Sequence, residues 1–193
     1  MGKVILVAIF LLAFIGCATK EVETKHYIPE YSAVSVSNPL FTPSPGQTFA
    51  WYSPVTIATG SQDVDAFLKK HSIPILNERL MAKGYKIVED NNQANYIIGL
   101  AIVNNHSDQS KKISNFFHLF PSLNDQESNH EYATAYVGVI DRRHLELVES
   151  GTSAEFLMWR SSVQAFAVRK DISSDQRLHR LQYLADTLMR GFP

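Results

Sequence analysis

The sequence has a single cysteine and no marked excess of either charge among its 193 residues. Its 18 basic and 19 acidic side chains give a formal net charge of −1, which excludes a strongly basic nucleic-acid binder, so we predict no nucleic-acid partner. A lone cysteine cannot close a disulfide within the chain, so the fold must be held by its hydrophobic core. Hydrophobic residues make up 45% of the sequence, which excludes a largely disordered chain and predicts one ordinary globular domain.

The sequence also lacks the motifs that carry common enzyme chemistry. It has no Gly-x-Ser-x-Gly elbow, no glycine-rich phosphate loop and no dinucleotide fingerprint. Its seven histidines show neither His-x-His nor His-Glu-x-x-His spacing, so we predict no metal site and no cofactor. We therefore expect a non-enzymatic protein without catalytic residues. A hydrolase whose acidic or histidine side chains meet only in space is the least favoured alternative.

The first residues have the layout of a secretory signal peptide. Lys3 precedes an unbroken apolar run from Val4 to Ile15, which Gly16 and Cys17 follow. As a helix, these 12 residues would extend over about 18 Å, well short of the roughly 30 Å hydrocarbon core of a bilayer. We therefore predict a cleaved signal over residues 1–16 and not a membrane-spanning helix.

The end of that run, Phe14-Ile15-Gly16-Cys17, resembles a bacterial lipobox, with phenylalanine where leucine is usual. The resemblance implies that fatty-acyl chains such as palmitate modify the Cys17 thiol and anchor the protein to a membrane. An ordinary signal peptide beside a buried thiol is the alternative. Ala18 stands where an aspartate would imply retention at the inner membrane, so the resemblance implies the periplasmic face of the outer membrane in a Gram-negative host. Residues 17–30 show no periodicity and are expected to form a tether.

Residues 31–193 alternate between the periods of strands and helices, which predicts a single α+β domain. We expect a largely antiparallel β-sheet with two main helices packed on one face, and a core that includes Trp51, Tyr85 and Trp159. The expected strands are Tyr31–Ser37, Thr48–Tyr52, Tyr85–Glu89, Asn95–Asn104, Tyr132–Asp141 and Ala154–Ala167, with a short one at Leu145–Glu149.

The two expected helices are marked by their apolar stripes and by their ends. The first covers Ser61–Lys83, where Pro74 predicts a kink or a restart capped by Ser72, and Gly84 predicts its end. The second begins at Ser173, which has capping-box spacing to Gln176, and it stops before Gly191.

The segment Asn105–Glu131 is polar and has no regular period, which predicts a long loop. Four large apolar side chains are nevertheless concentrated in it, at Phe116, Phe117, Leu119 and Phe120, and such side chains must be buried. One interpretation is a short amphipathic turn that folds back over the sheet. The other is a docking element for an envelope protein or for the membrane interface, which makes these four side chains the candidate partner-binding residues.

Five landmarks follow one another along nearly the whole domain. They are Thr48–Trp51, Leu80–Tyr85, Ala94–Tyr96, Leu157–Arg160 and Arg190–Pro193. In this order they resemble the bacterial lipoprotein family known as domain of unknown function 4136, with asparagine at position 95 where the family usually has aspartate. The connection over 142–152 is unusually long for that family. The resemblance implies a fold and a location, and it implies neither a reaction nor catalytic residues.

These features together predict a lipid-anchored cell-envelope protein whose periplasm-facing domain binds another envelope component. A carrier that holds a small apolar or lipid ligand between the sheet and the 105–131 segment is the alternative.

Overall fold

The structure is a computed structural model that describes residues 31–105, 107–121, 132–149, 154–166 and 172–193. The predicted signal peptide, Cys17 and the tether lie outside the described residues. Of the helices within the described ranges, none combines the length and the apolar character needed to cross a membrane.

Seven strands of the described part form one mixed sheet in the order β1-β7-β6-β5-β2-β4, and β3 also pairs with β5. In the part of the sheet from β1 to β5, each strand is antiparallel to its neighbours. The strands β2 and β3 run parallel to β5, and β4 runs parallel to β2. The predicted α+β domain with a largely antiparallel sheet is therefore confirmed. The strands are β1 (Tyr31–Ser37), β2 (Thr48–Trp51), β3 (Thr56–Ala58), β4 (Lys86–Ile87), β5 (Tyr96–Asn104), β6 (Tyr132–Asp141) and β7 (Leu157–Phe166).

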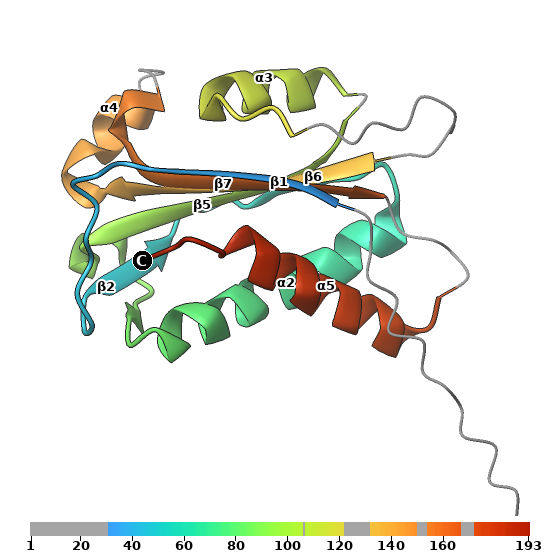
Figure 1. Cartoon of the computed structure of the whole chain (residues 1–193), viewed down its shortest axis with the longest axis horizontal. Coiled ribbons are helices and arrows are strands. Elements are labelled where there is room, and N and C mark those ends of the chain that lie inside the picture. Colours follow the sequence, from blue (N-terminus) through green and yellow to red (C-terminus); the bar gives the residue numbers. More distant parts are fainter. Residues whose placement is uncertain (1–30, 106, 122–131, 150–153, 167–171) are drawn as a thin grey trace, which may run out of the picture.

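Two long helices, α2 (Gln62–Ala82) and α5 (Ser174–Leu188), lie side by side on one face of the sheet, below it in Figure 1. The predicted capping box of α5 is confirmed, since Ser173 accepts from the backbone of Gln176 and the Gln176 side chain accepts from the backbone of Ser173. The predicted end of α2 is confirmed as well, because Gly84 has a φ of 88°, a conformation that glycine adopts without steric cost.

The helix α2 continues through Pro74, so the predicted restart capped by Ser72 is wrong. Ser72 is instead a buried residue inside the helix. A proline removes one backbone donor. Here the neighbouring turns are held by the burial of Ile75, Leu76 and Leu80, which compensates for that loss.

The opposite face of the sheet carries α3 (Asp108–Phe117) and α4 (Leu145–Glu149), above the sheet in Figure 1. Both correct the sequence-based expectation, since α3 lies in the predicted loop and α4 replaces a predicted strand. The Ser107 side chain accepts from the Ser110 backbone and caps α3. The short turn η2 (Arg142–His144) leads directly into α4.

Smaller differences concern the sheet margins. The strand β3 was not predicted, β4 is shorter than expected, and β7 begins only after the short turn η3 (Ala154–Phe156).

The sheet has a hydrophobic core on each face. Between the sheet and the α2–α5 pair, the ring of Trp159 is fully buried and its centroid lies 4.9 Å from that of Phe192. Tyr85 is buried in the same core and donates to the carbonyl of Pro193 over 2.9 Å. These two positions confirm the predicted core. Trp51 lies at its margin, half-buried, with its indole N–H donating to Asn77 Oδ1 over 2.7 Å.

Candidate functional site

A cavity of about 350 Å³ lies between the α2–α5 pair and the sheet, and we call it the helix-pair cavity. Its floor consists of alternate residues of β5, β6 and β7, all on the face of the sheet that α2 and α5 cover. Its walls are the facing sides of α2 and α5. The floor residues are Leu100, Ile102, Ala133, Ala135, Val163 and Ala165.

Small side chains at one end of β6 and β7 create this space. Ala133 is paired with Ala165 and Ala135 with Val163 in the strand register. Farther along the same face, Val139 is paired with Trp159, and these larger side chains fill the core up to the helices. Because protein interiors are close-packed, a run of alanines beneath two helices leaves room that larger residues would occupy.

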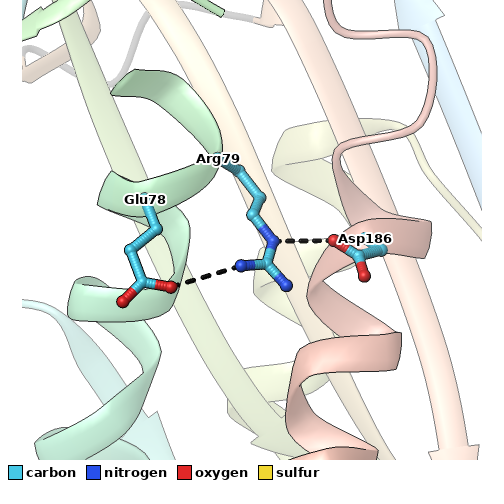
Figure 2. A network of polar contacts seen from close by, with 3 residues as sticks. All are labelled: Glu78, Arg79 and Asp186. Atoms are coloured by element: carbon cyan, nitrogen blue, oxygen red, sulfur yellow. Dashed lines mark hydrogen bonds and ion pairs between the residues drawn. The ribbon is translucent and has the colours of Figure 1, made fainter. Parts of the chain in front are cut away.

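The two helices are tied together away from this space. Arg79 of α2 donates through Nε to Asp186 Oδ1 of α5 over 2.7 Å, and its Nη1 lies 3.3 Å from Glu78 Oε2 (Figure 2). Both residues of the inter-helix pair belong to the C-terminal halves of their helices, and in Figure 1 the two helices cross while both run from right to left toward their C-terminal ends. The cavity is lined by α2 from Val64 to Leu76 and by α5 from Arg177 to Leu188.

Few polar groups line the cavity. Ser72 is 3% exposed, and its Oγ has no hydrogen-bond partner in the described part of the structure. Asp63, Arg177 and Arg180 are the acidic and basic side chains among the described lining residues, which leaves one net positive charge. Such a mostly apolar cavity with a few polar groups is the usual form of a small-molecule site. Thr59 also lines the cavity, and its hydroxyl donates to Asp65 Oδ1 over 2.7 Å.

A second hollow of about 340 Å³, which we call the α3 groove, lies on the opposite face of the sheet. Its floor includes Gly99 of β5 and Gly138 of β6, which are paired in the strand register. Tyr52, Phe116 and Phe117 also line it. Glycine side by side on neighbouring strands leaves a bare strip of backbone there, against which aromatic side chains pack.

The four candidate partner-binding residues have different surroundings. Phe117 and Leu119 are 7% and 1% exposed and belong to the core beneath α3, where the Phe117 ring stacks 5.4 Å from that of Tyr136. Phe116 is half-buried and Phe120 is 64% exposed. The greater part of this apolar group therefore folds back over the sheet, and Phe120 with part of Phe116 remains at the surface. Cys17, the predicted lipidation site, lies outside the described residues.

The histidines of the described ranges are dispersed. His71 packs against Phe67 with ring centroids 4.7 Å apart, His118 occupies the left-handed cap position of α3, and His144 packs against Phe156. In those ranges, no group of three or more His, Cys, Asp or Glu side chains is placed to hold a metal ion.

One carboxylate with a shifted pKa has a local structural role. The Arg143 guanidinium lies 2.6 Å from Asp141 Oδ2, and this hydrogen bond holds the pKa of Asp141 below its ordinary value. Asp141 also accepts from the Arg143 backbone and so caps η2. Neither residue lines either hollow, and the pair stabilises the turn that precedes α4.

Sequence reasoning missed the helix-pair cavity and its polar residues. A signal was present, since Ala133 and Ala135 alternate in one strand and Arg177 and Arg180 stand three residues apart on one helix face. The signal becomes meaningful only with the strand register, which brings the alanines of two strands into the cavity that those arginines also line.

Comparison with known proteins gives structural neighbours alone. No family model and no curated protein matches this sequence. Among solved structures, a PelC dodecamer from Paraburkholderia phytofirmans is similar with a TM-score of 0.44 at 12% identity, covering 83% of this chain and 98% of that one. A DUF4136 family protein from Bacteroides thetaiotaomicron is similar with a TM-score of 0.44 at 10% identity, covering 81% of this chain and 94% of that one.

Proposed function

We propose that this chain is a lipid-anchored, non-enzymatic protein of the bacterial cell envelope whose domain binds a small apolar or lipid molecule in the helix-pair cavity. The observation that carries the binding function is the apolar cavity beneath α2 and α5. The anchor and the location, the outer membrane of a Gram-negative host, rest on the signal-like segment and on Cys17. Membership of the domain of unknown function 4136 family is part of the same proposal and rests on the sequence landmarks.

The size of the cavity favours a ligand larger than a single ring. An engineered apolar cavity of about 150 Å³ is enough to bind benzene. The helix-pair cavity, at about 350 Å³, is more than twice as large. Each buried methylene contributes about 0.8 kcal/mol, so a chain of eight contributes roughly 6 kcal/mol, which corresponds to a Kd on the order of tens of micromolar.

The binding function is tested by narrowing the cavity. Ala135→Leu adds three carbons to the floor, and Ala82→Leu is the matched control, because Ala82 is exposed at the end of α2. We expect the purified wild-type protein to bind the neutral fluorescent probe N-phenyl-1-naphthylamine with saturation at one molecule per chain. Ala135→Leu should weaken this binding about tenfold or more, whereas Ala82→Leu should leave it unchanged.

The same measurement has clear adverse outcomes. Absence of saturable binding by the wild type contradicts the function, and so does equal binding by Ala135→Leu in a protein whose unfolding transition shows that it is folded. If Ala135→Leu fails to fold, Ala165→Val provides a smaller addition to the same floor. Native mass spectrometry of gently purified protein then reports directly whether a ligand accompanies the chain.

The anchor is tested separately, by fractionating the membranes of cells that express the wild type or Cys17→Ala and by intact mass spectrometry of each product. We expect acyl mass and outer-membrane sedimentation for the wild type, and neither for the variant. A wild-type protein that is unmodified and free of the membrane would contradict the anchor without affecting the cavity.

A second candidate function is docking of an envelope protein at the exposed surface next to the C-terminal end of α3. The observation that favours it is Phe120, a large apolar side chain that is 64% exposed next to the C-terminal end of α3. Crosslinking in intact membranes should recover one specific protein with the wild type and lose it with Phe120→Ser. Recovery that is the same for both proteins would count against this second function.

A further inference from the structure

We infer that Arg177 and Arg180 bind the head group of the cavity's ligand, and that the ligand is a single apolar chain ending in a carboxylate. This inference rests on the proposed function, since it assigns a ligand class to the same cavity. It follows from how polar and apolar side chains are distributed along the cavity-facing side of α5.

The cavity-facing side of α5 changes character along its length. Arg177 and Arg180 line the cavity in the N-terminal half of the helix, and Leu184 and Leu188 line it in the C-terminal half. Residues three and four apart share one helix face, so the four side chains form one continuous strip. A molecule lying along this strip contacts guanidinium groups at one end and an apolar wall at the other, which suits an amphiphile with a negative head.

Both arginines are held in the cavity lining and not on the open surface. Arg180 is 8% exposed, which is unusual for a charged side chain. Arg177 is half-buried, and its Nε is a buried donor without a hydrogen-bond partner in the described part of the structure. A buried donor that lacks a partner costs free energy, and a ligand oxygen that accepts from it removes this cost.

A third buried group supports the same assignment. Ser72 Oγ lines the cavity from α2 and also has no partner among the described residues. In the described part of the structure, Ser72 Oγ and Arg177 Nε are thus two buried donors that a ligand in this cavity can use. The planar guanidinium matches a carboxylate with two parallel hydrogen bonds.

The acidic lining residue does not cancel this preference. Asp63 is in the first turn of α2 and is exposed, so water screens its charge. The two guanidinium groups are farther from solvent, where electrostatic interactions are stronger. The lining therefore favours an anion over a cation next to Arg177 and Arg180.

The test compares three ligands that share a ten-carbon chain and differ in the head group: decanoate, decan-1-ol and decyltrimethylammonium. Each is used below its micellar concentration to displace N-phenyl-1-naphthylamine from the purified full chain. Hydrogen bonds to charged groups contribute about 1.5–3 kcal/mol, so we expect decanoate to bind about 10–100-fold more tightly than decan-1-ol. Decyltrimethylammonium should bind most weakly.

Variants then separate the head-group contacts from the apolar cavity. In Arg177→Gln and in Arg180→Gln, the preference for decanoate over decan-1-ol should fall about tenfold, while affinity for the neutral probe stays within about twofold. Arg180→Lys should retain part of the preference, since it keeps the charge and loses the paired geometry. Lys112→Gln is the control, because it removes one exposed positive charge from α3 on the opposite face of the sheet.

The outcomes distinguish this inference from the function on which it rests. Equal affinities of decanoate and decan-1-ol for a wild type that binds the probe would overturn the role of the arginines and leave the cavity function standing. A wild type that binds neither the probe nor any chain would overturn both. If Arg180→Gln does not fold, the half-buried Arg177→Gln and the wild-type comparison still decide the question.

Discussion

The paired glycines of the α3 groove allow a sharp prediction, because they are neighbours in the sheet and differ in what lies above them. Gly99 and Gly138 are directly opposite each other in the register of β5 and β6. A Cβ added at Gly99 meets nothing within 4 Å, whereas one added at Gly138 would lie 2.6 Å from Phe117 Cε1 and 3.0 Å from Leu157 Cδ2. Cβ atoms essentially never approach another atom closer than 3.0 Å, so at least the Phe117 side chain must shift to admit an alanine at 138.

The expected magnitudes follow from this geometry. Replacing glycine by alanine in an unstrained position stabilises a protein by about 0.4–1 kcal/mol, because the unfolded chain loses freedom. That gain is common to both variants. Overpacking a core costs about 1–3 kcal/mol, and this cost falls on Gly138→Ala alone, since Phe117 is buried and stacked on Tyr136. Gly138→Ala should thus be about 1–3 kcal/mol less stable than Gly99→Ala.

The assay is urea unfolding followed by circular dichroism, supported by thermal melting. For a domain of this size, the difference corresponds to about 2–12 °C in Tm. A smaller side chain at 117 should relieve the clash, so Phe117→Leu is expected to cost less in the Gly138→Ala background than in the wild type, by about 0.5–3 kcal/mol of coupling. Equal stabilities of the two alanine variants, or additive effects of Gly138→Ala and Phe117→Leu, would refute the packing of α3 on this strip.

Three further predictions concern other contacts. Because the folded-state pKa of Asp141 is lowered, its pairing with Arg143 stabilises the fold above the ordinary carboxyl pKa of 3.8 and is lost as the pH falls through the lowered value. Arg143→Gln should therefore reduce the free energy of unfolding near neutral pH and make progressively less difference as the pH falls below 3.8, which urea titrations at several pH values measure. Asp186→Asn should cost less than about 1 kcal/mol, and less in high salt, since the Asp186 side chain is 59% exposed where it meets Arg79; a larger loss in salt titrations would mean that the pair does more than hold two helices. Trp159→Ala should cost about 3–5 kcal/mol in the same unfolding assay, because the ring is fully buried, and a loss below 1 kcal/mol would contradict its place in the core.

Local patterns were sufficient for the elements with strong periodicity. The strands Tyr31–Ser37 and Tyr132–Asp141 were predicted with the bounds that the structure shows. The ends of the helices at Ser173 and Gly84 were also predictable, because a capping box and a left-handed glycine act within a few residues of sequence.

Weak local patterns led to the errors. The helix α3 has ten residues and only a narrow apolar face at Ile113, Phe116 and Phe117, so the predicted loop over 105–131 was too long. Short helices are marginal without tertiary contacts, and docking on the glycine strip supplies those contacts. The segment Leu145–Glu149 has a composition that suits a strand. It forms the helix α4 instead, directly after the helical turn η2.

The order of polar and apolar residues along the chain was enough to establish the α+β class, the ends of the main helices and the signal-like segment before Cys17, because each depends on neighbours within a few residues. The helix-pair cavity depends on contacts between distant segments. Ala133 and Ala165 meet through a strand register, and Arg180 of α5 lines the same cavity. Free volume and the burial of a charge are properties of packing between elements. They therefore depend on the tertiary structure and cannot be predicted from any single segment of the sequence.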